Sequence, residues 1–431
     1  MKQKSKRTLT PKLRFPEFRD RGEWQTPQLS DLYDFKRTNT LSRGMLNYEA
    51  GTIRNIHYGD IHTKFQSLFR VENEHVPFIN PETSVDAFEE EDDCEKGDIV
   101  LADASEDLND VGKAIEIISL DEQRVVAGTH TILATRRGDV PIIGFGGHLF
   151  QSAAVRTGIQ RESQGAKVYG ISANRISSVA LPLPPTNSEQ QKIAECLNSL
   201  DGLIAAEGRK LAALRDHKRG LMQQLFPQPG QTQPRLRFPE FRVKGEWEKK
   251  KAGSLFSQRK EKGETGLPIY SVTINDGMVL RSTFDRNFYD IEDPAGNKKA
   301  CKNDIAYNMM RMWQGACGVA PEDCMVSPAY VVLNPKKGTC PAFIDLLFKR
   351  PAILHLLMVY SRGLTLDRLR LYFDDFASIP LLVPAELEQQ RIAECLSSLD
   401  TRITAQAAKI ESLKQHKRGL MQQLFPAPEE V

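Results

Sequence analysis

The sequence predicts a mixed α+β protein with an internal pseudo-two-fold repeat. Two α/β inserts are each followed by one long helix, and the two helices pair as an antiparallel coiled coil. Three observations predict this arrangement: a long helical segment occurs twice, a shorter Arg- and Phe-rich segment opens each half, and short β-rich runs lie between these two ends. Because the halves share their ends and differ in their middles, one scaffold presents two different surfaces.

The repeated helical segment begins at Ser188 and returns at Leu387. Both copies carry Glu-Gln-Gln near the start and His-Lys-Arg-Gly-Leu-Met-Gln-Gln-Leu-Phe-Pro at the end, and His217 and His416 show a constant offset of 199 residues. Leu and Ile follow a period of about 3.5 residues, which is typical of a coiled-coil seam. We therefore predict two long helices that pack on each other. The alternative is two amphipathic helices that each lie on their own domain.

Apolar residues occupy eight of the ten seam positions in each copy. Four polar residues interrupt the seam at equivalent places: Glu207, Lys218, Gln406 and Lys417. They either set the register, accept a further helix or mark a solvated stretch. The predicted seam residues are Ile193, Leu197, Leu200, Ile204, Leu211, Leu214, Leu221 and Leu225, and in the second copy Ile392, Leu396, Leu399, Ile403, Ile410, Leu413, Leu420 and Leu424.

A second repeat opens each half, as PKLRFPEFRDRGEW at Pro11 and PRLRFPEFRVKGEW at Pro234. We predict that its aromatic residues anchor the first strand of each insert, and docking of a partner subunit is the alternative. Both copies are preserved, which indicates contact with something duplicated, either the helices or two partner subunits. The aromatic residues are Phe15, Phe18 and Trp24, and in the second copy Phe238, Phe241 and Trp247.

The inserts are predicted to be diverged versions of one α/β fold. Gly165 and Gly363 each lie 17 residues before a proline of the exit from their insert. Turn residues separate the short β-rich runs from short helical stretches. The runs are 97–101, 125–134, 304–307 and 330–333, and 341–348 is predicted to be helical.

Composition narrows the class of protein without naming a ligand. The formal net charge of +2 over 431 residues does not by itself indicate nucleic acid. No apolar run approaches the roughly 20 residues that span a bilayer, and the basic start lacks the apolar core of a signal peptide. The seven cysteines include no Cys-x-x-Cys pair, so we expect reduced thiols. These features predict a cytoplasmic protein that does not enter a membrane.

The order of these elements resembles the DNA-specificity subunit of type I restriction–modification systems. The resemblance rests on a variable insert, a proline-rich exit (LPLPP at Leu181, IPLLVP at Ile379), the Glu-Gln-Gln motif and the long helix, each occurring twice. It implies a subunit without catalytic activity whose two target-recognition domains each read one half of a bipartite DNA site, with a gap set by the helices. The implied segments are target-recognition domains at 1–187 and 228–386, spacer helices at 188–227 and 387–426, and a tail at 427–431.

The resemblance also implies partners. These are double-stranded DNA, two adenine-N6 methyltransferase subunits that use S-adenosylmethionine, and two restriction and translocase subunits that use ATP and Mg²⁺. Methylation would protect the host site while unmethylated phage DNA is cut. No cofactor or metal is expected in this chain, which has no Asn-Pro-Pro-Tyr or Asp-Pro-Pro-Tyr motif, no GxxxxGK[ST] phosphate loop and no HExxH. The main alternative is a coiled-coil adaptor that joins proteins without reading DNA, and a metal-dependent nuclease activity of the isolated chain is expected to be absent.

Candidate DNA contacts follow from side-chain chemistry, because Arg pairs with guanine or phosphate and aromatic rings pack on bases. Arg311 beside Trp313 is the sharpest local pair, with core packing as the alternative for the Trp. For each candidate cation the alternative is an ordinary surface charge. The candidates are Arg54, His57, Lys64, Arg156, Arg161 and Lys167 in the first insert, and Arg259, Lys260, Lys262, Arg311, Trp313, Arg362 and Arg368 in the second.

Overall fold

The computed structural model describes residues 9–83, 89–284, 296–429 and 431, and the chain forms two compact units. The first unit comprises the chain up to Gly208 together with Ala408–Val431, and the second comprises Arg209–Ala407. Each unit contains one insert, the first half of the long helix that follows it and the second half of the other long helix. A mixed α+β fold with an internal repeat is therefore confirmed.

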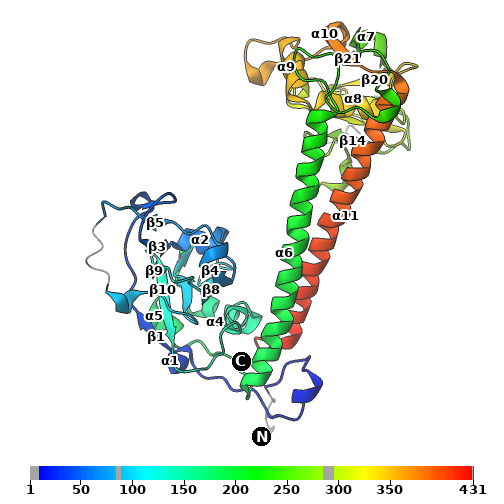
Figure 1. Ribbon diagram of the computed structural model, residues 1–431. Coiled ribbons are helices and arrows are strands. Elements are labelled where there is room, and N and C mark those ends of the chain that lie inside the picture. The colour runs from blue at the N-terminus through cyan, green and yellow to red at the C-terminus, as the bar shows by residue number, and fades with distance from the viewer. Residues whose placement is uncertain (1–8, 84–88, 285–295, 430) are drawn as a thin grey trace. The chain divides into compact units, whose positions relative to one another are not determined.

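The two long helices are α6 (Asn187–Gln224) and α11 (Glu386–Leu424), and Figure 1 shows each as one uninterrupted helix. Just before α6, the Thr186 hydroxyl accepts a hydrogen bond from the amide of Glu189 (3.3 Å), which satisfies one of the free amides at the helix start. Both helices run into the repeated Leu-Phe-Pro, whose phenylalanines Phe226 and Phe425 are fully buried in the cores of their units.

Ion pairs across the seam give the direction of the paired helix halves. In the first unit, Asp201 of α6 pairs with Lys417 of α11 (2.6 Å), and Glu207 pairs with Lys409. Residue numbers rise along one helix as they fall along the other, so these halves run antiparallel. In the second unit, Lys218 pairs with Asp400 (2.5 Å), which repeats the Asp201–Lys417 pair with the helices exchanged.

Three of the four predicted polar interruptions, Glu207, Lys218 and Lys417, therefore form cross-helix ion pairs. All of the predicted seam residues are buried or half-buried. An ion pair at one matched place in each copy specifies which residues face each other along the seam.

The first insert is built on two main sheets. The larger has the order β1-β10-β6-β8-β4 and the smaller β2-β5-β3-β9, with the pair β11-β7 beside them. The strands are β1 (Tyr33–Lys36), β2 (Leu46–Asn47), β3 (Ile53–Ile56), β4 (Leu68–Arg70), β5 (Phe78–Ile79), β6 (Ile99–Ala102), β7 (Ala104–Ser105), β8 (Ala114–Ser119), β9 (Arg124–Ala127), β10 (Thr131–Arg136) and β11 (Tyr169–Gly170). The helices are α1 (Leu29–Leu32), α2 (Tyr58–Thr63), α3 (Gly146–Leu149), α4 (Ala153–Glu162) and α5 (Ala173–Ile176).

The predicted β-run 125–134 is two strands of different sheets. Gly128 and His130 lie between β9 and β10, and His130 has a left-handed φ of 54° that ends the extended conformation. The prediction of one run was wrong because the polar turn Gly128-Thr129-His130 is short and strand-favouring residues lie on both sides of it.

The second insert repeats the design with the sheets β13-β20-β17-β18 and β15-β14-β19-β16 and the pair β12-β21. Its predicted helix 341–348 is α8 with those bounds. The strands are β12 (Glu248–Lys251), β13 (Phe256–Arg259), β14 (Ile269–Val272), β15 (Met278–Leu280), β16 (Lys298–Ala300), β17 (Ile305–Asn308), β18 (Cys317–Val319), β19 (Cys324–Val326), β20 (Tyr330–Pro335) and β21 (Pro380–Val383). The helices are α7 (Ala252–Leu255), α8 (Pro341–Phe348), α9 (Pro351–Val359) and α10 (Phe373–Ser378).

The repeated opening segments bind the starts of the long helices through a buried carboxylate. Arg14 donates two hydrogen bonds to Glu189 (both 2.7 Å), and the indole N–H of Trp24 approaches the same carboxylate at 3.3 Å. In the second unit Arg237 and Trp247 make the same contacts with Glu388, at 2.7, 2.6 and 3.3 Å. The long helices are thus one duplicated element that these segments contact.

The first glutamine of the Glu-Gln-Gln motif holds each insert. The Gln190 side chain accepts from the amide of Ile142 (3.0 Å), and Gln389 accepts from the amide of Cys340 (2.9 Å). Phe145 then packs on Phe425, and Phe343 packs on Phe226, with ring centroids 5.7 and 5.3 Å apart. These contacts place residues 142–154 and 340–352 in equivalent positions.

The described part of the chain shows neither a membrane-spanning helix nor a cluster of metal-binding side chains. None of its helices is both long enough and apolar enough to cross a membrane. Within the same residues, no group of three or more His, Cys, Asp or Glu side chains is placed to hold a metal ion.

Candidate nucleic-acid interface

Three of the candidate arginines use their donors inside their own domain. Arg156 donates to the backbone carbonyls of residues 109, 111 and 112 at 2.5 to 2.8 Å. Arg259 is held by Asp304 (2.5 Å) and Glu261 (2.7 Å). Arg54 donates to Gln123 and to the carbonyl of Val76, and its guanidinium lies 4.0 Å from the centre of the Phe78 ring.

Two other candidates, His57 and Lys64, lie at opposite ends of α2. The carboxylate of Asp60, on the same helix, is buried, with 3% of its side chain exposed. It accepts from Lys64 (2.8 Å) and from Arg43 (2.5 Å). Burial alone would raise the pKa of Asp60, but the hydrogen bonds from Arg43 and Lys64 outweigh that effect and lower the pKa below its ordinary value. A buried, ionised carboxylate thus fixes two half-exposed cations.

Aromatic rings border this cluster. The Tyr48 hydroxyl accepts from Arg43 (2.6 Å) and from Lys64 (2.9 Å), and the Tyr48 ring stacks on His75 with centroids 4.3 Å apart. Cations and stacked rings held together are the side chains that contact phosphates and bases. Arg43, Tyr48 and His75 were not among the candidates predicted from the sequence; Arg43 begins a short 3-10 helix before β2, and Tyr48 follows β2 directly.

His57 keeps one ring nitrogen without a hydrogen-bond partner among the described residues. Its Nδ1 accepts from the amide of Gly59 (3.1 Å), which assigns the ring proton to Nε2 in the neutral imidazole. Burial is the main cause that lowers the pKa of His57 below its ordinary value, so the ring is neutral at pH 7. A neutral imidazole N–H can donate to an acceptor on a base edge.

The two inserts share one exposed loop. Its ends are joined by paired backbone hydrogen bonds between Gln164 and Gly170 (2.8 and 2.7 Å) and between Arg362 and Arg370 (both 2.9 Å). A Cβ on Gly165 would lie 1.9 Å from the carbonyl oxygen of Val168, so glycine is required at this position. The equivalent Cβ on Gly363 would lie 2.6 Å from a backbone oxygen.

The tips of these loops carry apolar side chains beside cations. Val168 is 56% exposed next to the candidate Lys167, and Leu364 is 99% exposed in the loop that carries the candidate Arg368. Exposed apolar side chains flanked by cations suit a groove of DNA, where apolar residues contact bases and cations contact phosphates.

The remaining candidates are surface residues of their inserts. Arg362 pairs with Asp375 (2.6 Å) while remaining exposed. Trp313 is half-buried, and its indole N–H donates to the carbonyl of Met310 (3.1 Å), so it is neither a core residue nor a free one. Within the described ranges, the following candidates are exposed and have no side-chain partner: Arg161, Lys167, Lys260, Lys262, Arg311 and Arg368.

Comparison with known proteins gives a consistent result. The chain matches the family described as "Type I restriction modification DNA specificity domain" over residues 21–215 and again over 240–415. No curated protein sequence matches it.

Two solved structures share the fold over nearly the full length of both chains. The type I restriction–modification S subunit from M. genitalium has a TM-score of 0.56 at 14% identity, covering 97% of this chain and 99% of that one. A chain from a study of the complex assembly and conformational transition of the type I restriction–modification system has a TM-score of 0.54 at 16% identity, covering 94% and 98%.

Proposed function

Because this chain belongs to the family of type I restriction–modification DNA-specificity subunits, we propose that it reads a bipartite DNA site with one insert on each half. The observation that carries the proposal is the matched loop at 164–170 and 362–370. The repeated parts of the chain, which are the opening segments and the long helices α6 and α11, are here called the frame. The frame holds both loops in equivalent places of their inserts, while the side chains that the loops expose differ. Two inserts with different exposed side chains, held by one repeated frame, suit a DNA site whose two defined halves differ in base sequence.

The role of the chain is recognition, and we place the chemistry in its partners. The base to be modified is adenine, methylated at N6 by a subunit that uses S-adenosylmethionine. Cleavage of unmethylated DNA falls to a translocase subunit that uses ATP and Mg²⁺. The frame is duplicated, so it offers two equivalent docking surfaces, which supports two copies of each partner. Such a complex works where chromosomal DNA lies, in the cytoplasm.

A coiled-coil adaptor without DNA recognition is not favoured. An adaptor needs the long helices, but it has no use for fixed cations beside stacked rings such as those around Asp60. It also gives no reason for the exposed cations on the matched loops, Lys167 in the first insert and Arg368 in the second.

Methylation mapping tests the proposal. The chain is coexpressed with its neighbouring methyltransferase candidate, and adenine methylation is mapped across the host genome by single-molecule sequencing. We expect a split motif, two short defined halves around an undefined gap, that disappears when this chain is omitted. A stable complex that adds no methylation would contradict the proposal and restore the adaptor.

A further inference from the structure

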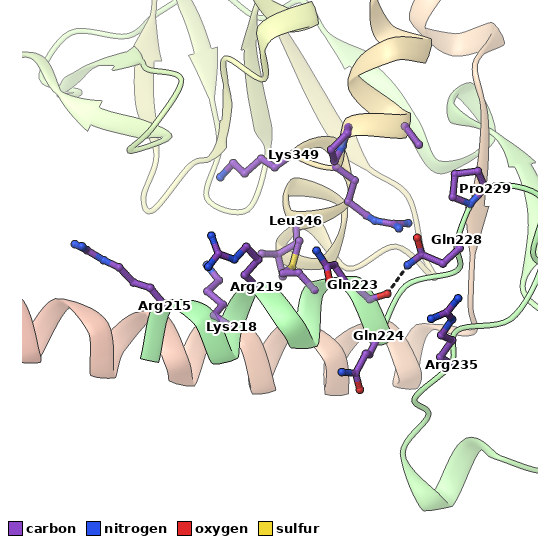
Figure 2. A pocket seen from close by; sticks show the side chains of 14 residues that line it. Arg215, Lys218, Arg219, Gln223, Gln224, Gln228, Pro229, Arg235, Leu346 and Lys349 are labelled. Carbon is purple, nitrogen blue, oxygen red and sulfur yellow. Dashed lines mark hydrogen bonds between the residues drawn. The ribbon is translucent and has the colours of Figure 1, made fainter. Parts of the chain in front are cut away.

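A cationic pocket of about 810 Å³ lies in the second unit, between the last turns of α6 and the turn that joins α8 to α9. Figure 2 shows Lys218 and Arg219 rising from α6 toward Leu346 and Lys349. Of the described residues that line the pocket, none is acidic. Its cations are Arg215, Lys218, Arg219, Arg235, Lys349 and Arg350.

Three of these six cations have a carboxylate partner. Lys218 pairs with Asp400 (2.5 Å), Lys349 pairs with Asp345 (2.7 Å), and Arg219 pairs with Asp216. Within residues 9–83, 89–284, 296–429 and 431, the other three have none, and all three are arginines: Arg215, Arg235 and Arg350.

The unpaired arginines indicate a ligand with a negative charge. Arg350 is half-buried with its guanidinium 5.1 Å from the centre of the Phe226 ring, and burial lowers its pKa. Burying a cation without a counter-ion is unfavourable, and a bound anion offsets that cost. The planar guanidinium matches two oxygens of a phosphate at once, which lysine does not do.

The start of α9 adds to the positive electrostatic potential of the pocket. Arg350 is the N-cap of α9 and makes no side-chain capping hydrogen bond, while Pro351 and Ala352 of the first turn line the pocket. Pro351 has no N–H, and the amide of Ile353 donates to the carbonyl of Arg350 (2.9 Å), so the start of α9 adds the positive end of its helix dipole beside the cations.

The second insert supplies charge that the first insert lacks. The equivalent residues of the frame are also basic, with Lys414, Lys417 and Arg418 on α11 and Lys12 in the opening segment. However, Lys349 and Arg350 correspond to Gln151 and Ser152. Ser152 is neutral and caps α4 by accepting from the amide of Val155 (3.5 Å).

We propose that this pocket binds backbone phosphates of DNA next to the half-site that the second insert reads. The inference rests on the proposed function. The pocket lies at the start of α9, which is about 13 Å long at 1.5 Å per residue. The exposed loop 362–370 follows its other end, and the turn that carries Arg311 and Trp313 packs on it.

That geometry favours DNA over an acidic protein segment. A DNA strand advances about 3.4 Å per base, so phosphates about four bases from the contacts of the 362–370 loop come within reach of the pocket. Phosphate contacts position a protein without reading bases. The pocket thereby strengthens binding at one half of the DNA site, whatever the base sequence there.

Salt-dependent DNA binding by the full-length chain tests this inference. The triple variant Arg215→Gln, Arg235→Gln, Arg350→Gln is compared with wild type on one duplex, and log Kd is plotted against log salt concentration. Each phosphate contact contributes about 0.9 to the slope, so we expect the slope of the triple variant to fall by about 2 to 3. At low salt its affinity should fall at least about tenfold.

Two further variants separate charge from folding and from position. The triple variant Arg215→Lys, Arg235→Lys, Arg350→Lys keeps the charges and should keep most of the slope. The matched variant Lys12→Gln, Lys414→Gln removes equivalent cations from the first unit and should lower the slope by less than about 1.

The outcomes separate this inference from the proposed function. An unchanged slope in the glutamine variant, with wild type still binding DNA, overturns the pocket's role alone. Loss of the methyltransferase subunit from the copurified complex, with DNA binding unchanged, also overturns it and assigns the pocket to that protein. If the wild-type chain binds no duplex at all, both proposals fail.

Discussion

The frame and the inserts of this molecule differ in how closely their two copies agree. In the frame, Glu189 and Glu388 accept the same hydrogen bonds from an arginine and a tryptophan, with distances that agree within 0.1 Å. The Asp201–Lys417 and Asp400–Lys218 pairs agree equally well. The frame therefore fixes how each insert is held, and the inserts are free to differ in what they present.

A buried carboxylate in the first insert has no equivalent in the second. On β8, Glu116 accepts from the amides of Gly144 (2.8 Å) and Gly147 (2.6 Å) at α3. In the second insert Val319 takes the place of Glu116, because it pairs with Ile305 of β17 as Glu116 pairs with Ile99 of β6. The second insert thus has an apolar residue where the first has a buried carboxylate, so the inserts have diverged while the frame has not.

The largest expected effect comes from breaking the frame. Glu189→Ala leaves the guanidinium of Arg14 buried without its partner, which should cost about 3–5 kcal/mol of unfolding free energy. The matched change, Glu388→Ala, leaves Arg237 in the same state and should cost the same amount. Urea denaturation of both variants measures the two costs. Values that differ widely, or that stay below about 1 kcal/mol, would show that the frame is not equivalent in the two halves.

A smaller, pH-dependent effect should be confined to the first insert. Burial raises the pKa of Glu116 to about 7, above its ordinary value of 4.5. The folded state therefore holds the proton more tightly, and the stability that this supplies is complete below pH 4.5 and is lost as the pH rises through about 7. Its full size is on the order of 3 kcal/mol.

The Glu116→Gln variant isolates this effect. The difference in unfolding free energy between wild type and the variant should shift against wild type as the pH rises from about 4.5 to about 7. Asp98 and His148, which also have shifted pKa values in this unit, are present in both proteins and cancel. A pH-independent difference in urea denaturation would show that Glu116 does not titrate in this range.

Changes at the exposed loops and at the Asp60 cluster should act on one half-site each. Lys64→Ala should weaken discrimination only in the half read by the first insert, and Arg368→Ala only in the other, by about 1–3 kcal/mol if they contact bases. Competition binding against duplexes with single substitutions in either half measures this. Equal weakening on every sequence would assign the residue to a phosphate instead.

The smallest expected effect concerns the seam. Lys218→Met and Lys417→Met each remove one half-exposed ion pair and should change stability by no more than about 1 kcal/mol, to a similar extent in both copies. Double-mutant cycles with Asp400→Asn and Asp201→Asn measure the coupling. A large coupling in only one copy would show that the seam is not symmetric.

The frame could be predicted from the sequence because its signals are local and repeated. The 3.5-residue period and the proline-rich exits mark both long helices, and the apolar run 341–348 marks α8. The prediction of one strand over 125–134 was wrong because a short turn, with His130 in the left-handed region, divides two stretches that both favour strands.

The candidate site was less predictable because residue type does not give side-chain direction. Arg156 and Arg259 look like Arg161 and Arg311 in the sequence, yet the first two bind groups of their own domain. The Asp60 cluster draws on residues from Arg43 to His75, and only folding brings them together.

The claim that each insert reads its own half of one split site has a direct test. Adenine methylation is mapped by single-molecule sequencing in cells that express the methyltransferase candidate with either wild type or the first-insert variant Lys64→Ala, Lys167→Ala. We expect relaxed base preference on one side of the gap, with the gap length and the other half unchanged. Relaxation of both halves, or a changed gap, would contradict the account.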